Sequence, residues 1–209
     1  MIDAATLAAF FAVSALLALA PGPDNLYVLT QSALRGPGAG LAVTVGLCTG
    51  LLVHTGAVAL GVAALVRASA TAFAALKLAG AGYLLYLAWR AFGAAATELR
   101  GAGERALGGW ALYRRGIFMN VTNPKVSIFF LAFLPQFADP ARGALAPQIV
   151  LLGGVFIVAA LLVFGAISFA AGALGERLRR SARAQRWLNR VAGAVFVGLA
   201  LKLAASEIG

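Results

Sequence analysis

Charged residues are scarce in this sequence. Of its 209 residues only 11% are charged, whereas 62% are hydrophobic. A soluble domain carries about 25% charged residues, so the composition excludes an ordinary soluble protein. Several apolar stretches exceed the roughly 20 residues that a helix needs to cross a bilayer. The composition therefore predicts an all-α polytopic membrane protein whose surface faces lipid.

Cysteine and histidine are almost missing as well. Cys48 and His54 are the single residues of their types, which excludes an intramolecular disulfide and a Cys-rich metal site. The sequence has no His/Glu zinc motif and no phosphate-binding GxxxxGK[ST] motif. We therefore predict no catalytic residues, no metal site and no cofactor. A metal or other ion carrier and a membrane-embedded enzyme without a recognisable motif stay as alternatives to a transporter.

The apolar stretches divide the chain into two halves of three spans each. Residues 1–92 form the first three-helix half, 93–112 a glycine-rich linker and 113–209 the second half, within one membrane domain. The predicted spans are 4–33, 40–66, 70–92, 113–136, 146–174 and 187–206.

Basic residues are concentrated in alternate connections. One side of the membrane would carry Arg35, Arg90, Arg100, Arg105, Arg114, Arg115, Arg177, Arg179, Arg180, Arg183, Arg186 and Arg190. The other side would carry Arg67, Lys77, Arg142 and Lys202. The positive-inside rule then places the arginine-rich connections in the cytoplasm and both termini outside. In a membrane protein the distribution of the net charge of +10 among the connections matters more than its size, so we predict no nucleic-acid partner.

The two halves contain matching short motifs in the same order. Gly22-Pro23-Asp24 matches Asn123-Pro124-Lys125, and Arg35-Gly36 matches Arg142-Gly143. Lys77-x-x-Gly80 likewise matches Arg190-x-x-Gly193. A repeated unit of three spans must invert its orientation in the membrane. We therefore predict two inverted three-helix repeats.

The first and fourth spans are predicted to break in the middle. The first contains Pro21, Gly22 and Pro23, and the fourth contains Pro124. Proline removes a backbone donor and clashes with the preceding turn, so these residues would unwind the helix and act as hinges. Exposed backbone is tolerated in a bilayer only against protein or water. Inverted repeats with broken helices in matching positions are typical of the midplane binding site of a transporter.

Two charged residues follow these breaks. Asp24 either binds substrate or a coupling proton, as intramembrane carboxylates usually do, or caps the broken half-helix. Lys125 occupies the matching position, where it would bind a substrate carboxylate, pair with Asp24 or extend to the membrane surface. An aspartate and a lysine on opposite walls would suit a zwitterion.

Uncharged polar groups flank the same breaks. Asn25 and Asn123 adjoin the prolines and are the stronger candidates for substrate contact, while Gln31, Asn120 and Thr122 lie further away. Each of these residues would either contact a substrate or satisfy opened backbone groups.

The second span carries the histidine and a glycine motif. His54 would serve as a proton relay or as a hydrogen-bonded packing residue. Gly46-x-x-x-Gly50 permits close helix contact. This surface makes a homodimer possible.

Three segments resemble one family of membrane proteins. APGPDNLYVLTQSALRGPGAGLAVTVGLCTGLLVH resembles the first two helices of the lysine exporter (LysE/RhtB) family, KLAGAGYLLYLAWRAF its third and NVTNPKVSIFFLAFLPQF its fourth. The resemblance implies an inner-membrane carrier that exports amino acids or related metabolites and is driven by the proton motive force. Many members carry an aspartate after the glycines of the second helix, where this sequence has Leu51. That departure leaves Asp24 and His54 as the titratable candidates for coupling.

Overall fold

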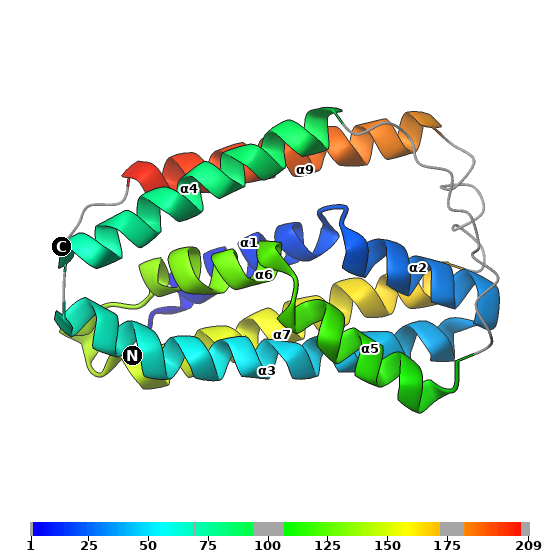
Figure 1. Ribbon diagram of the computed structural model, residues 1–209, viewed down its shortest axis with the longest axis horizontal. Helices are drawn as coiled ribbons and strands as arrows, with labels where there is room; N and C mark the ends of the chain where they lie inside the picture. The colour runs from blue at the N-terminus through cyan, green and yellow to red at the C-terminus, as the bar shows by residue number, and fades with distance from the viewer. Residues whose placement is uncertain (1, 69, 94–106, 172–181, 206–209) are drawn as a thin grey trace.

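The computed structural model describes residues 2–68, 70–93, 107–171 and 182–205. Every regular element among these residues is a helix, as the composition predicts. The long helices run lengthwise along one axis of the molecule (Figure 1).

The first predicted span consists of two helices. Helix α1 covers Ala4–Leu19 and α2 covers Pro23–Arg35, and they meet at a bend of 65°. Pro21 has no N–H to offer the carbonyl of Leu17, and Pro23 has none for Leu19, so the helical ladder cannot continue. Proline suits the first position of a new helix, which explains why α2 begins at Pro23. The predicted break is confirmed.

The fourth predicted span is broken as well. Helix α5 covers Gly109–Val121 and α6 covers Pro124–Ile128, and the chain bends by 49° between them. A π-helix, η1, follows over Phe129–Phe133, and a 3₁₀-helix, η2, over Leu134–Phe137. The π-helix was not predicted; such widened turns are frequent at functional sites.

The remaining helices complete the bundle. Helix α3 covers Pro37–Ala68, α4 Ala70–Gly93, α7 Leu145–Ala170 and α9 Ala182–Ala205, and a short 3₁₀-helix, η3, covers Pro140–Arg142. Within the described part of the chain, α3 over Pro37–Gly61 and α7 are long and apolar enough to cross a membrane, and each bent pair qualifies as one further span. Helices α4 and α9 occupy the predicted third and sixth spans. That each of them crosses the membrane stays a prediction. The predicted end of the fifth span, 172–174, lies outside the described residues.

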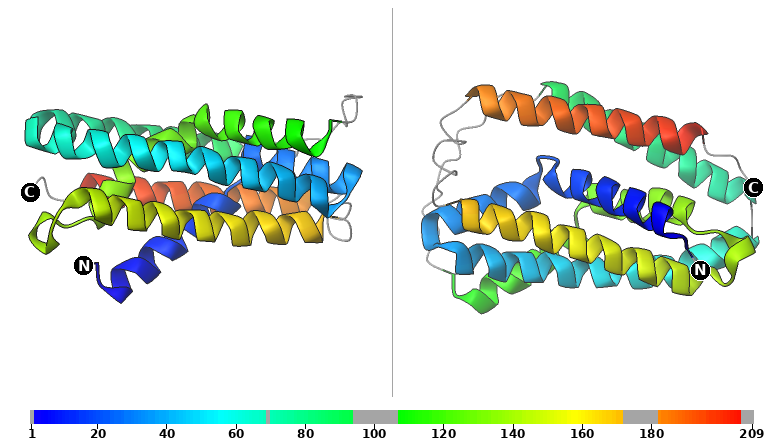
Figure 2. Two further views of the ribbon diagram at one scale, coloured as in Figure 1. Left: turned by 90° about the horizontal axis from the view of Figure 1, so that it is seen from below. Right: turned by 180° about the vertical axis from the view of Figure 1, so that it is seen from behind.

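The helices pack in a pattern that relates the two halves. Helix α3 packs against α5 and α7, α1 packs against α7, and α4 packs along α9. In Figures 1 and 2, α4 and α9 form a pair along one side of the bundle. The start of α1 and the end of α9 lie at the same end of the molecule. We call this the terminal end, and the opposite end, where α2 finishes and α5 begins, the arginine end.

Backbone conformation supports the internal repeat. Among the described residues, positive φ occurs only at Gly36 (85°) and Gly143 (121°), which are equivalent in the sequence repeat. A left-handed conformation favours glycine because it has no Cβ. A Cβ at Gly80 would collide with the Ala132 side chain of η1 and lie 3.3 Å from that of Leu203 of α9, and one at its counterpart Gly193 would lie 2.7 Å from the Phe92 ring of α4. Gly36 and Gly143 thus serve equivalent turns, whereas the six-span inverted arrangement stays a prediction.

Glycine also sets the crossing of α3 and α5. A Cβ at Gly46 would collide with the carbonyl oxygen of Tyr113, and one at Gly116 would collide with that of Val43. A Cβ at Gly50 would lie 2.7 Å from side-chain atoms of Asn120. The Gly46-x-x-x-Gly50 motif is therefore already occupied within the chain by α5. This surface therefore does not support the homodimer that the sequence made possible.

Aromatic rings fill the half of the bundle near the terminal end. Phe129 lies at the centre of this cluster, with ring centroids 5.0 Å from Phe133 and 5.4 Å from Phe156 of α7. Phe10 of α1 packs edge-on against Phe137 at 4.9 Å. These rings are almost fully buried. The aromatic cluster comprises Phe10, Phe129, Phe130, Phe133, Phe137 and Phe156.

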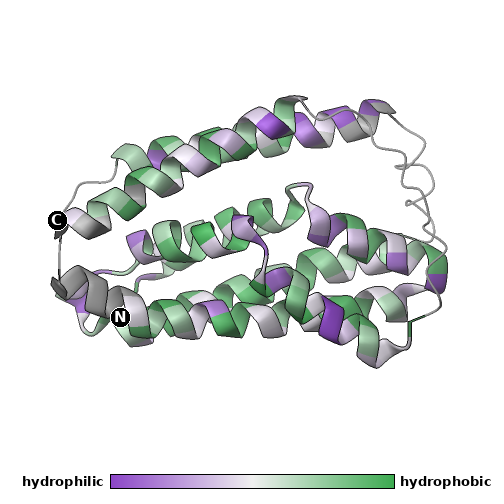
Figure 3. Cartoon of the chain, in the orientation of Figure 1, coloured by the Kyte–Doolittle hydropathy of each residue, from purple (hydrophilic) through white to green (hydrophobic). Residues whose placement is uncertain are grey.

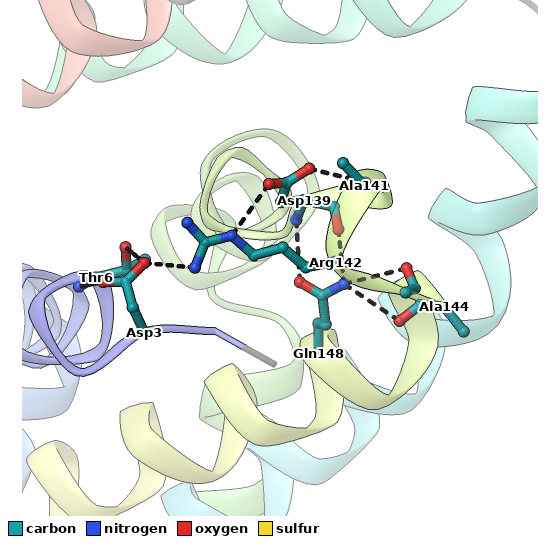
Figure 4. A network of polar contacts seen from close by, with 8 residues as sticks. Asp3, Thr6, Asp139, Ala141, Arg142, Ala144 and Gln148 are labelled. Atoms are coloured by element: carbon teal, nitrogen blue, oxygen red, sulfur yellow. Dashed lines mark hydrogen bonds and ion pairs between the residues drawn. The ribbon is translucent and has the colours of Figure 1, made fainter.

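A polar network joins the start of α1 to the connection before α7 (Figure 4). Asp3 caps α1 by accepting the N–H of Thr6 at 2.8 Å, and it accepts Arg142 Nη1 at 2.6 Å. Arg142 Nε donates to Asp139 at 3.2 Å. Gln148 binds Asp139 through both amide atoms, accepting its backbone N–H at 3.0 Å and donating to its carbonyl at 2.8 Å. The hydrogen bonds from Thr6, and then the contact with Arg142, lower the pKa of Asp3 to about 2.

Gly46→Ala is expected to destabilise the α3–α5 crossing, because the added methyl group would overlap a backbone carbonyl. Overpacking of this kind costs about 1–3 kcal/mol. Gly56→Ala is the matched control, since no atom lies within 4 Å of a Cβ built there. Thermal unfolding of both variants in detergent measures the effect. Equal unfolding temperatures would show that α3 and α5 do not touch at Gly46.

Asp3 is expected to add stability only where it is ionised. Its folded pKa is depressed to about 2, against about 3.9 for an unfolded aspartate. Its contribution is therefore complete above about pH 4 and disappears as the pH falls towards about 2. Thermal unfolding of wild type and Asp3→Asn across this range measures it. A stability difference that does not shrink on acidification would contradict the assignment.

Candidate functional site

The two helix breaks meet in the interior of the bundle. Asn123, which caps α6, donates from Nδ2 to Asp24 Oδ2 in the first turn of α2 at 2.7 Å. The other amide atom of Asn123, Oδ1, accepts the backbone N–H of Lys125 at 3.0 Å. The Asn123 side chain thus caps α6 and also binds the carboxylate of Asp24 at the other break. In Figure 3 both breaks are hydrophilic segments within largely apolar helices.

Lys125 extends from the fourth span to the broken end of α1. Its Nζ donates to the carbonyl of Leu17 at 3.3 Å and to that of Ala20 at 3.2 Å. Leu17 is the residue whose donor Pro21 removes, so the lysine replaces the missing backbone N–H. A Cβ at Gly22 would lie 3.3 Å from Nζ, so glycine leaves room for the ammonium group. Lys125 is 7% exposed and does not extend to the membrane surface.

Asn25 satisfies another carbonyl of the same break. Its Nδ2 donates to the carbonyl of Ala18 at 2.6 Å, whose usual donor would be the N–H of Gly22 in an unbroken helix. Asn25 and Lys125 therefore close the first break from two different elements.

His54 closes the second break in the same manner. Its Nε2 lies 3.1 Å from the carbonyl oxygen of Asn120, and its ring packs 5.6 Å from that of Phe130. Because a carbonyl only accepts, Nε2 must carry the proton and donate it. Asn120 stands four residues before Pro124, as Leu17 stands four residues before Pro21. In each half, a nitrogen-bearing side chain from a different span binds the carbonyl four residues before the proline. The carbonyl of Asn120 also accepts the backbone N–H of Asn123 at 3.0 Å.

Acceptor atoms without donors gather at the breaks. Asp24 Oδ1, Asn25 Oδ1 and Asn120 Oδ1 are buried and have no hydrogen-bond partner among the described residues. Buried polar groups are normally paired, and each unpaired one costs about 1–3 kcal/mol. The unpaired groups here are all acceptors, which a ligand with several N–H donors would satisfy.

Helix α2 turns its polar side towards the interior. Gln31 and Ser32 are buried, whereas Leu26 and Leu34 are exposed. Gln31 Oε1 and Ser32 Oγ have no partner within the described part of the chain. A polar stripe thus runs along the buried face of α2 from Asp24 towards the arginine end. Ser32 was not singled out from the sequence, although its helical spacing of eight residues from Asp24 places it on the same face.

The predicted site residues therefore come together. Asp24, Asn25, Asn123 and Lys125 all contact one of the two breaks, and His54 joins them through Asn120. Asn120 contributes more than its distance from the proline indicated, because its carbonyl binds His54 and its side chain packs against Gly50 of α3. Within the described residues, no three His, Cys, Asp or Glu side chains lie close enough to hold a metal ion. The chemistry available is hydrogen bonding and charge pairing.

Comparison with known proteins assigns the chain to a family. The model of the LysE type translocator matches residues 15–207, which include both breaks. The chain belongs to this family. A homoserine/homoserine lactone efflux protein of Salmonella typhimurium is 34% identical, over 95% of this chain and 96% of its own length. A leucine efflux protein of Salmonella choleraesuis is 26% identical, over 90% of this chain and 89% of its own length.

Membership of this family defines the broad functional class of the protein. It is a membrane transporter, and its relatives include amino acid efflux proteins. An uncharacterized membrane protein of Vibrio cholerae is 32% identical over 95% of this chain and 96% of its own length. No solved structure matches the chain.

The stability of the site is expected to show coupling between Lys125 and Asp24. Lys125→Met leaves two buried carbonyls without a donor, each costing about 1–3 kcal/mol, and leaves Asp24 without a nearby cation. Adding Asp24→Asn should recover part of this loss because it removes the uncompensated charge. A double-mutant cycle on thermal unfolding measures the coupling.

The matched control combines Lys125→Met with Asp139→Asn. Asp139 lies in the polar network at the terminal end, so those two effects should add. Additive effects for Lys125 and Asp24 as well would show that the two breaks are energetically independent.

Proposed function

We propose that this protein exports amino acids or closely related metabolites across the bacterial inner membrane, coupled to the proton motive force. The observation that carries the proposal is the meeting of the two broken spans, with Asn123 bound to Asp24 and Lys125 bound to the end of α1. Carriers bind their substrates at broken helices near the bilayer midplane. The names of the related efflux proteins support the substrate class.

The groups at the breaks match both ends of an amino acid. An ammonium group has several N–H donors and would bind Asp24 Oδ1, with Asn25 Oδ1 and Asn120 Oδ1 as further acceptors. Lys125 has three donors and uses two on carbonyls, which leaves one for the substrate carboxylate. Asp24 would bind either the substrate amine or the coupling proton. If a proton displaces the substrate, the carboxylate binds the two in turn.

His54 fits a structural role better than a relay. Its Nε2 is engaged by the carbonyl of Asn120, which leaves only Nδ1 for a second hydrogen bond. We assign His54 to closing the second break and Asp24 to proton exchange.

The distribution of polar and apolar residues supports alternating access. The aromatic cluster fills the half of the bundle next to the terminal end, while the polar stripe of α2 runs towards the arginine end. With the arginine-rich connections in the cytoplasm, as the positive-inside rule requires, this arrangement would be closed on the outside. Pro21, Gly22, Pro23 and Pro124 would be the hinges that let each span bend at its break.

Two inverted repeats of three spans fit this scheme. Under an exchange of halves, the contact of α3 with α5 becomes that of α7 with α1, and both contacts occur. The contacts of α3 with α7 and of α4 with α9 map onto themselves. We therefore propose six spans with both termini outside.

Asp24→Asn is expected to reduce export by about tenfold or more, because a charge-assisted hydrogen bond contributes about 1.5–3 kcal/mol. Proteoliposomes loaded with radiolabelled L-homoserine or L-leucine, with an imposed pH gradient, measure the rate. Lys125→Met should also lose export. Thr122→Val is the matched control, since the Thr122 hydroxyl bonds its own helix at Phe118 and should leave the rate unchanged. If a full panel of amino acids showed no gradient-dependent flux in wild type, the result would favour a metal or other ion carrier or a membrane-embedded enzyme over this proposal.

A further inference from the structure

A polar cavity lies at the terminal end of the molecule. It has a volume of about 310 Å³, at the lower end of the ~300–1,000 Å³ typical of small-molecule sites. Its walls come from the start of α1, from η2 and the connection that follows, and from the last turns of α9. The chemistry-bearing lining residues are Asp3, Thr6, Gln136, Asp139, Arg142 and Lys202.

Two acidic and two basic side chains line this cavity, but only one of the basic side chains forms ion pairs with the acidic ones. Arg142 binds Asp3 and Asp139. Lys202 instead holds its Nζ 4.0 Å from the ring centroid of Phe137 and 5.8 Å from that of Phe133. No carboxylate of the described residues forms an ion pair with Lys202. The cavity therefore offers one cation against an aromatic ring and two carboxylates, both of which bind Arg142.

We infer that this cavity is an outer binding site for the zwitterionic head group of an amino acid. The ligand carboxylate binds Lys202 Nζ, and the ligand ammonium binds Asp3 or Asp139. An apolar side chain lies along Phe137 and Ala9, which also line the cavity. The choice of an amino acid as ligand rests on the proposed function.

The cavity is separate from the site at the breaks. Phe129 and Phe133 are fully buried between the two regions, and none of the residues at the breaks lines the cavity. A ligand here would contact the ends of both broken spans, since Asp3 precedes α1 and Gln136 lies in η2. Occupancy would therefore compete with the contacts that join those ends, and the site is placed to receive a substrate after it leaves the interior.

Equilibrium binding to protein in nanodiscs tests the inference without any transport. The starting protein is Asp24→Asn, in which the interior site lacks its carboxylate, and the probes are the common amino acids and L-homoserine in radiolabelled form. Asp24→Asn should still bind at least one probe. Adding Lys202→Met should weaken that binding about tenfold or more, because a charge-assisted contact is lost. Adding Lys202→Arg should retain it.

Controls separate charge from packing. Leu201→Met changes the neighbouring residue, which is 62% exposed, and should leave binding unchanged. For an L-leucine site, 4-methylpentanoate, which has only the carboxylate, should lose binding with Lys202→Met, whereas 3-methylbutylamine, which has only the amine, should not.

Two results would overturn the inference. One is that Asp24→Asn binds no member of the panel, and the other is that Lys202→Met leaves the affinity unchanged. Neither result touches the proposed function, which fails instead if wild-type proteoliposomes export no amino acid. The two failures are therefore distinguishable.

Discussion

The hydrogen bonds from Lys125 to the broken end of α1 are the contact on which the rest of the structure depends. Two prolines leave carbonyls of the first span without donors at a depth where lipid offers none. Lys125 supplies those donors from the fourth span, and Asn123 binds the carboxylate that follows the break. Each break is thus stable only because the other is beside it. The same mutual dependence places a carboxylate and an ammonium group in one interior region.

This dependence explains how the bundle is divided. A carrier that binds its substrate at polar groups in its centre must close them off on one side of the membrane and leave them accessible to the substrate from the other. Aromatic rings from α1, η1, η2 and α7 fill the half near the terminal end, and the polar face of α2 occupies the other half. Close packing at Gly46 and Gly116 holds α5 against α3. The division is what the proposed alternating-access mechanism requires of one access state.

Much of this was predictable because proline chemistry is local. The break at Pro21 and Pro23 and the break at Pro124 follow from missing N–H groups, and the repeat indicated that the two breaks are equivalent. The partners of the breaks were less predictable, since His54 reaches Asn120 only through the packing of α3 on α5. The π-helix and the Asp3–Arg142 contact depend on three-dimensional packing, so no spacing in the sequence indicates them. The glycine motif of α3 predicted close helix contact, which is confirmed, but the sequence could not show that the partner is α5, which also presents a glycine there.

The most direct test of the central claim is whether the two breaks touch. Cysteines replace Asp24 and Asn123 in a Cys48→Ser background, membranes are treated with a short bifunctional thiol reagent, and mass spectrometry detects the linked peptides. Side chains joined by a 2.7 Å hydrogen bond between their terminal atoms have Cβ atoms further apart than the ~4 Å that a disulfide needs, but a reagent with a two-carbon bridge spans them and should cross-link them within one chain. A control pair, Asp24→Cys with Asp139→Cys, should not cross-link. Absence of the first link, under conditions in which the reagent modifies both thiols, would contradict a shared interior site.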